Sequence, residues 1–166
     1  VISSLALESS LMRFWYESKS LEEKKKLINS LFFLIFTIGC FLLILLYFFS
    51  KPFSSFLFDN SDFYGLIILG GISAVMISLQ SLSLMVLRME RKIVKFNMIG
   101  IFQTSVYVTF TLILLYYFDF GIYSVMYGMV FSYLFSLTLS LFFVKKYIKI
   151  TFNSSIALSN LTYSLP

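Results

Sequence analysis

The hydrophobic positions of this chain fall into four long uncharged runs, separated by short charged or polar segments. The runs cover residues 27–50, 63–87, 96–118 and 120–144. A helix that crosses a bilayer needs about 20 consecutive apolar residues, and each run is longer than that. Strands of a membrane β-barrel are about 10 residues long and alternate between apolar and polar positions, whereas these runs do neither. The pattern predicts an all-α fold, a polytopic transmembrane helical bundle with four complete spans.

The flanks of the four runs predict that they belong to a longer protein. Residues 1–16 are mostly apolar and end in a cation followed by three aromatic residues, at 13–16. A cation beside aromatic side chains is typical of a membrane interface, so we expect residues 1–16 to be the end of a preceding transmembrane helix. Residues 17–26 are expected to form a loop, and residues 145–166 a linker that leads to a next helix.

The loop before the first run carries a signal for the start of a helix. Ser20 is followed three residues later by Glu23. This is the spacing of a capping box, in which each side chain pairs with the backbone amide of the other residue. We therefore expect the chain to become helical here and to continue as a helix into the first span.

Charge divides the connections between the spans into two groups. The first, third and fifth connections hold twelve of the 13 Lys and Arg residues, and the other two hold only Lys51 together with three aspartates. Because positively charged loops stay on the cytoplasmic side, residues 17–26, 88–95 and 145–149 are expected to be cytoplasmic. The predicted location is the cell (cytoplasmic or inner) membrane, which the chain crosses several times. Lipid headgroups explain the net charge of +5, so nucleic acid is not expected as a partner.

Composition excludes several classes of protein and of site. Hydrophobic residues make up 59% of the 166 residues and charged residues 13%, against about 45–50% and about 25% in soluble domains. The mean hydropathy is +0.91. The high aromatic content excludes disorder, the single cysteine excludes a disulfide scaffold, and the lack of histidine excludes a histidine metal or acid–base site. With no phosphate-binding loop and no metal-ligand spacing, we predict that the chain is not an enzyme and holds no cofactor or metal.

Small residues recur at helical spacing in two of the spans and predict close helix packing. Transmembrane helices associate through small residues that let their backbones approach, and positions four apart lie on nearly one face of a helix. Contact with a transported substrate is the alternative interpretation of these stripes. The second span carries Gly71, Ala74, Ser78 and Ser81, and the fourth carries Ser124, Gly128, Ser132, Ser136 and Ser140.

Two amides inside the spans are candidates for a polar site. Gln80 lies well within the second run, and Gln103 within the third, where Tyr107 follows one turn later. An amide that faced lipid would cost several kcal/mol, so both should face a partner helix or a water-filled cavity. They either form a hydrogen bond between helices or line a transport pathway for sugar hydroxyls or phosphate. No Asp, Glu, Lys or Arg lies within the four runs, which argues against an ion-coupling site there.

Several segments carry a resemblance to a known family. The stretch LALESSLMRFWYE at residues 5–17 has a small-hydrophobic-Glu-Ser pattern followed by Arg13 and an aromatic residue. The basic loop LRMERKIVKFN, the tight turn FDFGIYS with Gly121, and the final Leu165-Pro166 follow in order. In this layout the chain resembles the polysaccharide (O-antigen-type) flippases of the multidrug/oligosaccharidyl-lipid/polysaccharide flippase superfamily. The resemblance covers the whole chain and rests on order and spacing.

The resemblance implies a fold of two helical lobes, of which this chain holds the end of the second helix and helices three to six. It implies a transporter that flips polyprenyl-diphosphate-linked oligosaccharide across the cytoplasmic membrane for polysaccharide biosynthesis. The implied partners are membrane lipid, the lipid-linked oligosaccharide and the remaining helices of the same protein. Arg13 is the cation that the resemblance places near a cavity mouth. The predicted substrate pathway comprises Arg13, Gln80, Gln103 and Tyr107.

Two other functions are compatible with the sequence. A multidrug or cation exporter of the same superfamily would share the fold, but we would expect it to carry a buried acid, and the four runs contain none. A small four-helix membrane scaffold or channel subunit would consist of these four spans alone.

Overall fold

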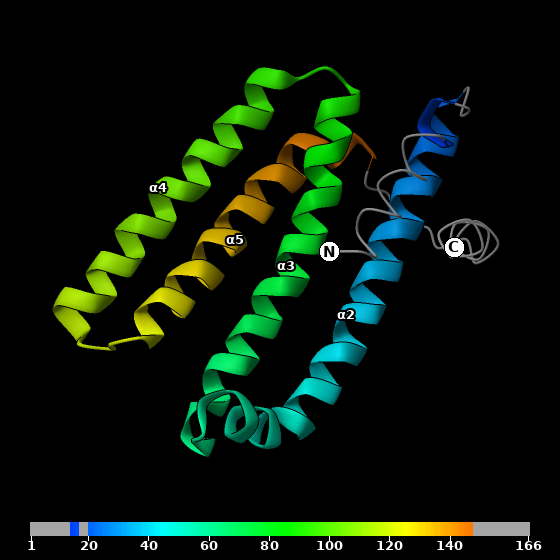
Figure 1. Ribbon diagram of the computed structural model, residues 1–166. Helices are drawn as coiled ribbons and strands as arrows, with labels where there is room; N and C mark the ends of the chain where they lie inside the picture. The colour runs from blue at the N-terminus through cyan, green and yellow to red at the C-terminus, as the bar shows by residue number, and fades with distance from the viewer. Residues whose placement is uncertain (1–13, 17–19, 148–166) are drawn as a thin grey trace.

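The structure, a computed structural model, describes residues 14–16 and 20–147, and it is helical over nearly all of them (Figure 1). Four of its helices are long and apolar enough to cross a membrane, which confirms the prediction of an all-α, four-span bundle. The predictions made for residues 1–13 and 148–166 lie outside the described residues. The long helices are α2 (Leu21–Phe58), α3 (Tyr64–Met89), α4 (Ile93–Phe118) and α5 (Tyr123–Val144), and two short 3-10 helices are η1 (Ser61–Phe63) and η2 (Lys145–Tyr147).

The order of the helices in space differs from their order in the chain. Across the bundle they lie as α2, α3, α5 and α4 (Figure 1). Helix α5 packs against both α3 and α4, whereas α3 and α4 make few contacts with each other although they are consecutive. Helix α5 therefore lies between α3 and α4, although a short turn joins α3 directly to α4.

Helix α2 extends beyond the first uncharged run at both ends. At its start the Ser20 hydroxyl accepts a hydrogen bond from the Glu23 amide (3.2 Å), and the Glu23 carboxylate accepts one from the Ser20 amide (3.4 Å). This confirms the predicted capping box. The helix continues through Pro52 to Phe58 and ends at Asp59, which adopts a left-handed conformation with φ 52°. The connection to α3 is therefore shorter than the gap between the first two uncharged runs.

The two ends of the bundle differ in charge. One end, which we call the acidic end, holds Asp59, Asp62 and Asp119 in the α2–α3 and α4–α5 connections. Gly121 gives the α4–α5 turn its tightness, because its φ of 52° is a conformation that side chains disfavour. The opposite end, which we call the basic end, holds the α3–α4 turn, the start of α2 and η2 (Figure 1). Most of the described Lys and Arg residues lie there.

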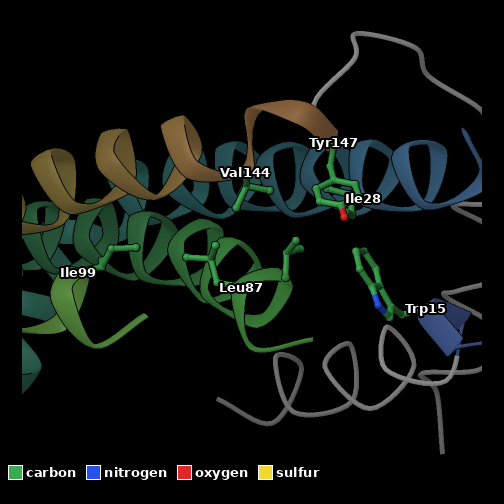
Figure 2. Close-up of a cluster of buried hydrophobic side chains, with 7 residues drawn as sticks. Trp15, Ile28, Leu87, Ile99, Val144 and Tyr147 are labelled. Carbon is green, nitrogen blue, oxygen red and sulfur yellow. The ribbon is translucent and has the colours of Figure 1, made fainter. Parts of the chain in front are cut away.

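The main apolar core lies at the basic end of the bundle. Its buried side chains come from α2, α3, α4, α5 and η2, together with Trp15 (Figure 2). Over the rest of the bundle, large apolar side chains such as Phe41, Phe48 and Tyr117 are exposed. Lipid is the environment that suits such surfaces. The core residues are Trp15, Ile28, Val86, Leu87, Ile99, Val144 and Tyr147.

Candidate functional site

Three polar side chains from three helices meet inside the bundle, and we call them the amide cluster (Gln80 of α3, Gln103 of α4 and Ser136 of α5). Gln80 Nε2 donates a hydrogen bond to Gln103 Oε1 (2.8 Å) and another to Ser136 Oγ (2.6 Å). Ser136 Oγ also lies 3.5 Å from Gln103 Oε1, to which it donates. Of the two roles that the sequence allowed, the structure therefore places both amides in a hydrogen bond between helices. A role as the wall of a transport pathway stays a prediction.

The amide cluster is neutral and has one acceptor to spare. Gln80 is only 2% exposed and Ser136 is fully buried, whereas Gln103 is half-buried. Within the described residues, Gln80 Oε1 is buried with no hydrogen-bond partner. A buried acceptor without a donor is costly in an apolar environment. The cluster can thus receive a hydroxyl or amide donor, but it has no charge with which to hold an ion.

The other two predicted pathway residues stand apart from the amide cluster. Tyr107 is half-buried on α4, one turn beyond Gln103, and within the described part of the chain no hydrogen bond joins it to the cluster. Arg13 lies outside the described residues. The structure thus brings together two of the four residues predicted for the substrate pathway.

The small-residue stripe of α5 is buried along its whole length. A side-chain Cβ at Gly128 would overlap Thr111 Oγ1 of α4 and lie 3.2 Å from the Thr111 backbone nitrogen. Only glycine therefore allows α4 and α5 to approach this closely. Two of the serine hydroxyls donate to carbonyls of their own helix, each at 2.8 Å. The buried members are Ser124, Gly128, Ser132, Ser136 and Ser140.

The stripe of α3 is divided between different surroundings, because α3 has a neighbour on each side. Gly71 faces α2, where a Cβ would lie 3.1 Å from Leu43 Cδ2. The buried serines of α3 are Ser73 and Ser83, which the predicted stripe does not include. The remaining members of that stripe are exposed or half-buried: Ala74, Ser78 and Ser81.

A second polar group at the basic end was not predicted, and we call it the Glu90 cluster (Glu90, Lys92, Lys146 and Tyr147). Lys92 Nζ donates to Glu90 Oε2 (2.5 Å), and Lys146 Nζ lies 2.5 Å from Glu90 Oε1. The Tyr147 hydroxyl also donates to Glu90 Oε1. One carboxylate therefore links the α3–α4 turn to η2. The signal in the sequence was a single acid inside the basic loop 88–95, which the charge pattern alone did not single out.

The backbone of the α3–α4 turn positions this carboxylate. The Lys92 amide donates to the Leu87 carbonyl (2.9 Å) and the Arg91 amide donates to the Arg88 carbonyl (3.0 Å). This pair of bonds is a Schellman motif, which ends a helix through one residue in the left-handed conformation. Here that residue is Arg91, with φ 57°. The motif holds Glu90 and Lys92 on the side of the turn that meets η2.

Hydrogen bonding keeps Glu90 ionised. Burial by itself raises the pKa of this carboxyl, but hydrogen bonds from Lys146, Lys92 and Tyr147 outweigh burial and lower the pKa from 4.5 to about 2. The Glu90 side chain is 9% exposed, whereas the side chains of Lys92 and Lys146 are 33% and 50% exposed. The carboxylate is therefore largely covered, whereas the two lysine side chains that contact it are partly exposed.

Comparison with known proteins identifies the family of the chain. A family model described as "Polysaccharide biosynthesis protein" matches residues 13–166, which include all four long helices, the amide cluster and the Glu90 cluster. No curated protein and no solved structure matches the chain.

Proposed function

Since the chain belongs to the family of polysaccharide biosynthesis proteins, we propose that it is part of a transporter that flips polyprenyl-diphosphate-linked oligosaccharide across the cytoplasmic membrane. The observation that carries this proposal is the family match over all four helices that are long and apolar enough to span a membrane. In this proposal the chain is a transporter and not an enzyme. Its partners are membrane lipid, the lipid-linked oligosaccharide and the remaining helices of the same protein.

The chemistry of the amide cluster supports a glycan as the cargo. Amide and hydroxyl groups bind sugar hydroxyls through neutral hydrogen bonds, and Gln80 Oε1 is an acceptor that still needs a donor. A coupling-ion or cation site inside a membrane normally uses an acid, and the four uncharged runs hold none. The amide cluster therefore favours a glycan over the cation that an exporter would carry.

Helix α4 supplies a way to open the cluster. Ile99 is the one residue of α4 that is buried within the described part of the chain, and α4 makes few contacts with α3. A shift of α4 relative to α3 and α5 would break the bonds to Gln103 and free its amide for a sugar, while Gln80 would keep its bond to Ser136. Alternating access in transporters commonly uses such rigid movements of helices or lobes.

The charge of the bundle ends supports an orientation for transport. We place the basic end in the cytoplasm and the acidic end on the outer side, following the rule that positive loops remain inside. The headgroup of the lipid-linked substrate would then first meet the basic end of the bundle, where the Glu90 cluster lies.

The experiment that tests the proposal is a flipping assay on the full-length protein in liposomes, with a short-chain polyprenyl-diphosphate glycan that carries a fluorophore. Wild-type protein should move the probe between leaflets faster than protein-free liposomes do. Gln103→Leu should leave insertion intact and slow flipping severalfold. The matched control is Thr104→Val, because Thr104 is exposed and its hydroxyl bonds only within α4, to the Gly100 carbonyl (3.1 Å).

Each outcome of this assay has a distinct meaning. No flipping by the wild-type protein would contradict the proposed function. Normal flipping by Gln103→Leu would assign this residue to helix packing and remove the amide cluster from the pathway. Equal slowing by Thr104→Val would mean that any change on α4 impairs transport, and the amide itself would have no special role.

A further inference from the structure

The Glu90 cluster is continued by an aromatic pair and a third lysine. The Tyr147 and Trp15 rings pack with centroids 5.3 Å apart (Figure 2). Lys24 Nζ stands 4.7 Å from the centroid of the Trp15 ring. Three lysines and one carboxylate therefore surround two buried aromatic side chains at one end of the bundle. Because Glu90 stays ionised, the group has a net charge of about +2 at neutral pH.

The two lysines bound to Glu90 have donors left over. A lysine ammonium group carries three N–H donors, and Glu90 accepts one from Lys92 and one from Lys146. The carboxylate beneath holds both ammonium groups in place, on opposite oxygens. A surface lysine loses side-chain conformational entropy when it binds an anion. Because Glu90 already holds Lys92 and Lys146, binding an anion costs these two lysines less entropy.

We propose that Lys24, Lys92 and Lys146 form a binding site for the phosphoryl anion of a membrane lipid. A diphosphate diester carries about two negative charges, one on each phosphoryl group, which balances the charge of the site. Trp and Tyr side chains gather at the depth of lipid headgroups, so the Trp15–Tyr147 pair sets the site at the level where such phosphates lie.

Two sources present this chemistry at the membrane surface. One is the diphosphate of a lipid-linked glycan, and this source rests on the proposed function. The other is the phosphate of an anionic bilayer lipid, which needs no transport activity. Both sources require the same lysine ammonium groups. Substitution of the lysines therefore tests the site, and the choice of probe shows which source binds there.

The chain offers matched control lysines next to the proposed site. Lys145 neighbours Lys146 in the sequence, and both stand over an aromatic ring: Lys145 lies 4.7 Å from the centroid of Phe142 and Lys146 lies 4.6 Å from that of Tyr147. Lys95 follows Lys92 by three residues and stands over Phe143, at 4.9 Å. Neither is paired with Glu90 in the structure. Each control removes the same charge from a lysine near the proposed site without touching the Glu90 ion pairs.

The test is a binding titration of the full-length protein in detergent by calorimetry, with inorganic pyrophosphate and then farnesyl diphosphate. Trp15 fluorescence is a second readout beside the site. Lys92→Gln or Lys146→Gln should weaken binding about tenfold, the cost of one charge-assisted hydrogen bond. Lys145→Gln and Lys95→Gln should change it less than about twofold. Lys24→Gln should also weaken binding and leaves the Glu90 ion pairs intact, so it decides the matter if the other site variants fail to fold.

A parallel arm uses nanodiscs that contain either phosphatidylglycerol or phosphatidylcholine and counts retained lipids by native mass spectrometry. Retention of phosphatidylglycerol that depends on Lys92 and Lys146, without diphosphate binding, would assign the site to bilayer lipid. Diphosphate binding would assign it to the substrate lipid. No saturable binding of any phosphoryl probe, or equal losses in Lys145→Gln and Lys146→Gln, would overturn the proposal.

The binding test needs no transport. Normal phosphoryl binding in a protein that does not flip lipids would contradict the proposed function and leave the site standing. If the protein flips lipids but its site lysines bind no phosphoryl group, the proposed function stands and the proposed site is contradicted.

Discussion

Because Gln80 Oε1 is buried without a hydrogen-bond donor, we predict that Gln80 and Gln103 contribute unequally to the free energy of unfolding. Replacing Gln103 with Leu removes the interhelical bond that its Oε1 accepts from Gln80 and the longer one that it accepts from Ser136. Such a bond is worth about 0.6 kcal/mol on average in membrane proteins and up to about 1.7. The substitution also leaves one Gln80 N–H without an acceptor, in a side chain that is 2% exposed. We expect Gln103→Leu to lower the free energy of unfolding by about 1–2 kcal/mol.

Replacing Gln80 with Leu has two opposing effects. It removes the bonds to Gln103 and Ser136, about 1.2 kcal/mol together. It also removes the buried oxygen that lacks a partner, which relieves about 1–3 kcal/mol. Gln103 is half-buried, so its amide has room to turn outward. We expect Gln80→Leu to be close to neutral, and therefore less harmful than Gln103→Leu by at least about 1 kcal/mol.

The measurement is thermal unfolding of the full-length variants in one detergent, with the double variant to complete the cycle. About 1 kcal/mol corresponds to a Tm shift of about 2–4 °C in a chain of this size. The double variant should resemble Gln80→Leu alone, because Gln103 loses its main role once Gln80 is gone. A Gln80→Leu variant that is clearly less stable than Gln103→Leu would refute this reasoning and would mean that Gln80 Oε1 has a donor.

Three further predictions concern the turns and the closest helix crossing. Gly128→Ala should destabilise the protein by about 1–3 kcal/mol through the clash with Thr111. Gly100→Ala is its control, because a Cβ there meets nothing within 4 Å, and it should be neutral or stabilising in the same Tm assay. Lowering the pH from 4.5 toward 2 should cost about 1–2 kcal/mol, since a carboxyl with a lowered pKa contributes its full stability above pH 4.5 and loses it progressively as the pH falls toward 2. In Glu90→Gln the Tm should not show this fall between pH 4.5 and 2. If the fall is unchanged in the variant, another titrating group causes it. Arg91→Gly should raise stability by about 0.5–1 kcal/mol, because φ 57° suits glycine. A lower Tm in that variant would show that the Arg91 side chain stabilises the turn.

The sequence predicted the spans because their cause is local. Run length and the absence of charge decide whether a segment forms a spanning helix, and the Ser20–Glu23 pairing depends on residues three apart. The burial of the α5 stripe also follows from one residue type repeated every fourth position. These features need no knowledge of which helices are neighbours.

The sites depended on neighbours and were predicted only in part. The sequence indicated that Gln80 and Gln103 need partners, but their pairing with Ser136 requires α5 to lie between α3 and α4, which hydropathy does not encode. The same order divides the α3 stripe, because Gly71 faces α2. Glu90 and Tyr147 are 57 positions apart. Their contact follows from the packing of helix ends, so loop charge alone could not reveal it.

The placement of α5 between α3 and α4 also constrains how the protein is made. Helix α4 leaves the ribosome before α5, which is its main neighbour in the described part of the chain. It must therefore enter the bilayer before its main neighbour, and its apolar composition permits this. Helix α5 then has to enter the lipid with its serines. Ser132 and Ser140 donate to carbonyls of α5 itself, so these hydroxyls are satisfied before any neighbour is reached. The insertion machinery can release both helices one after the other, and lateral assembly can follow within the membrane.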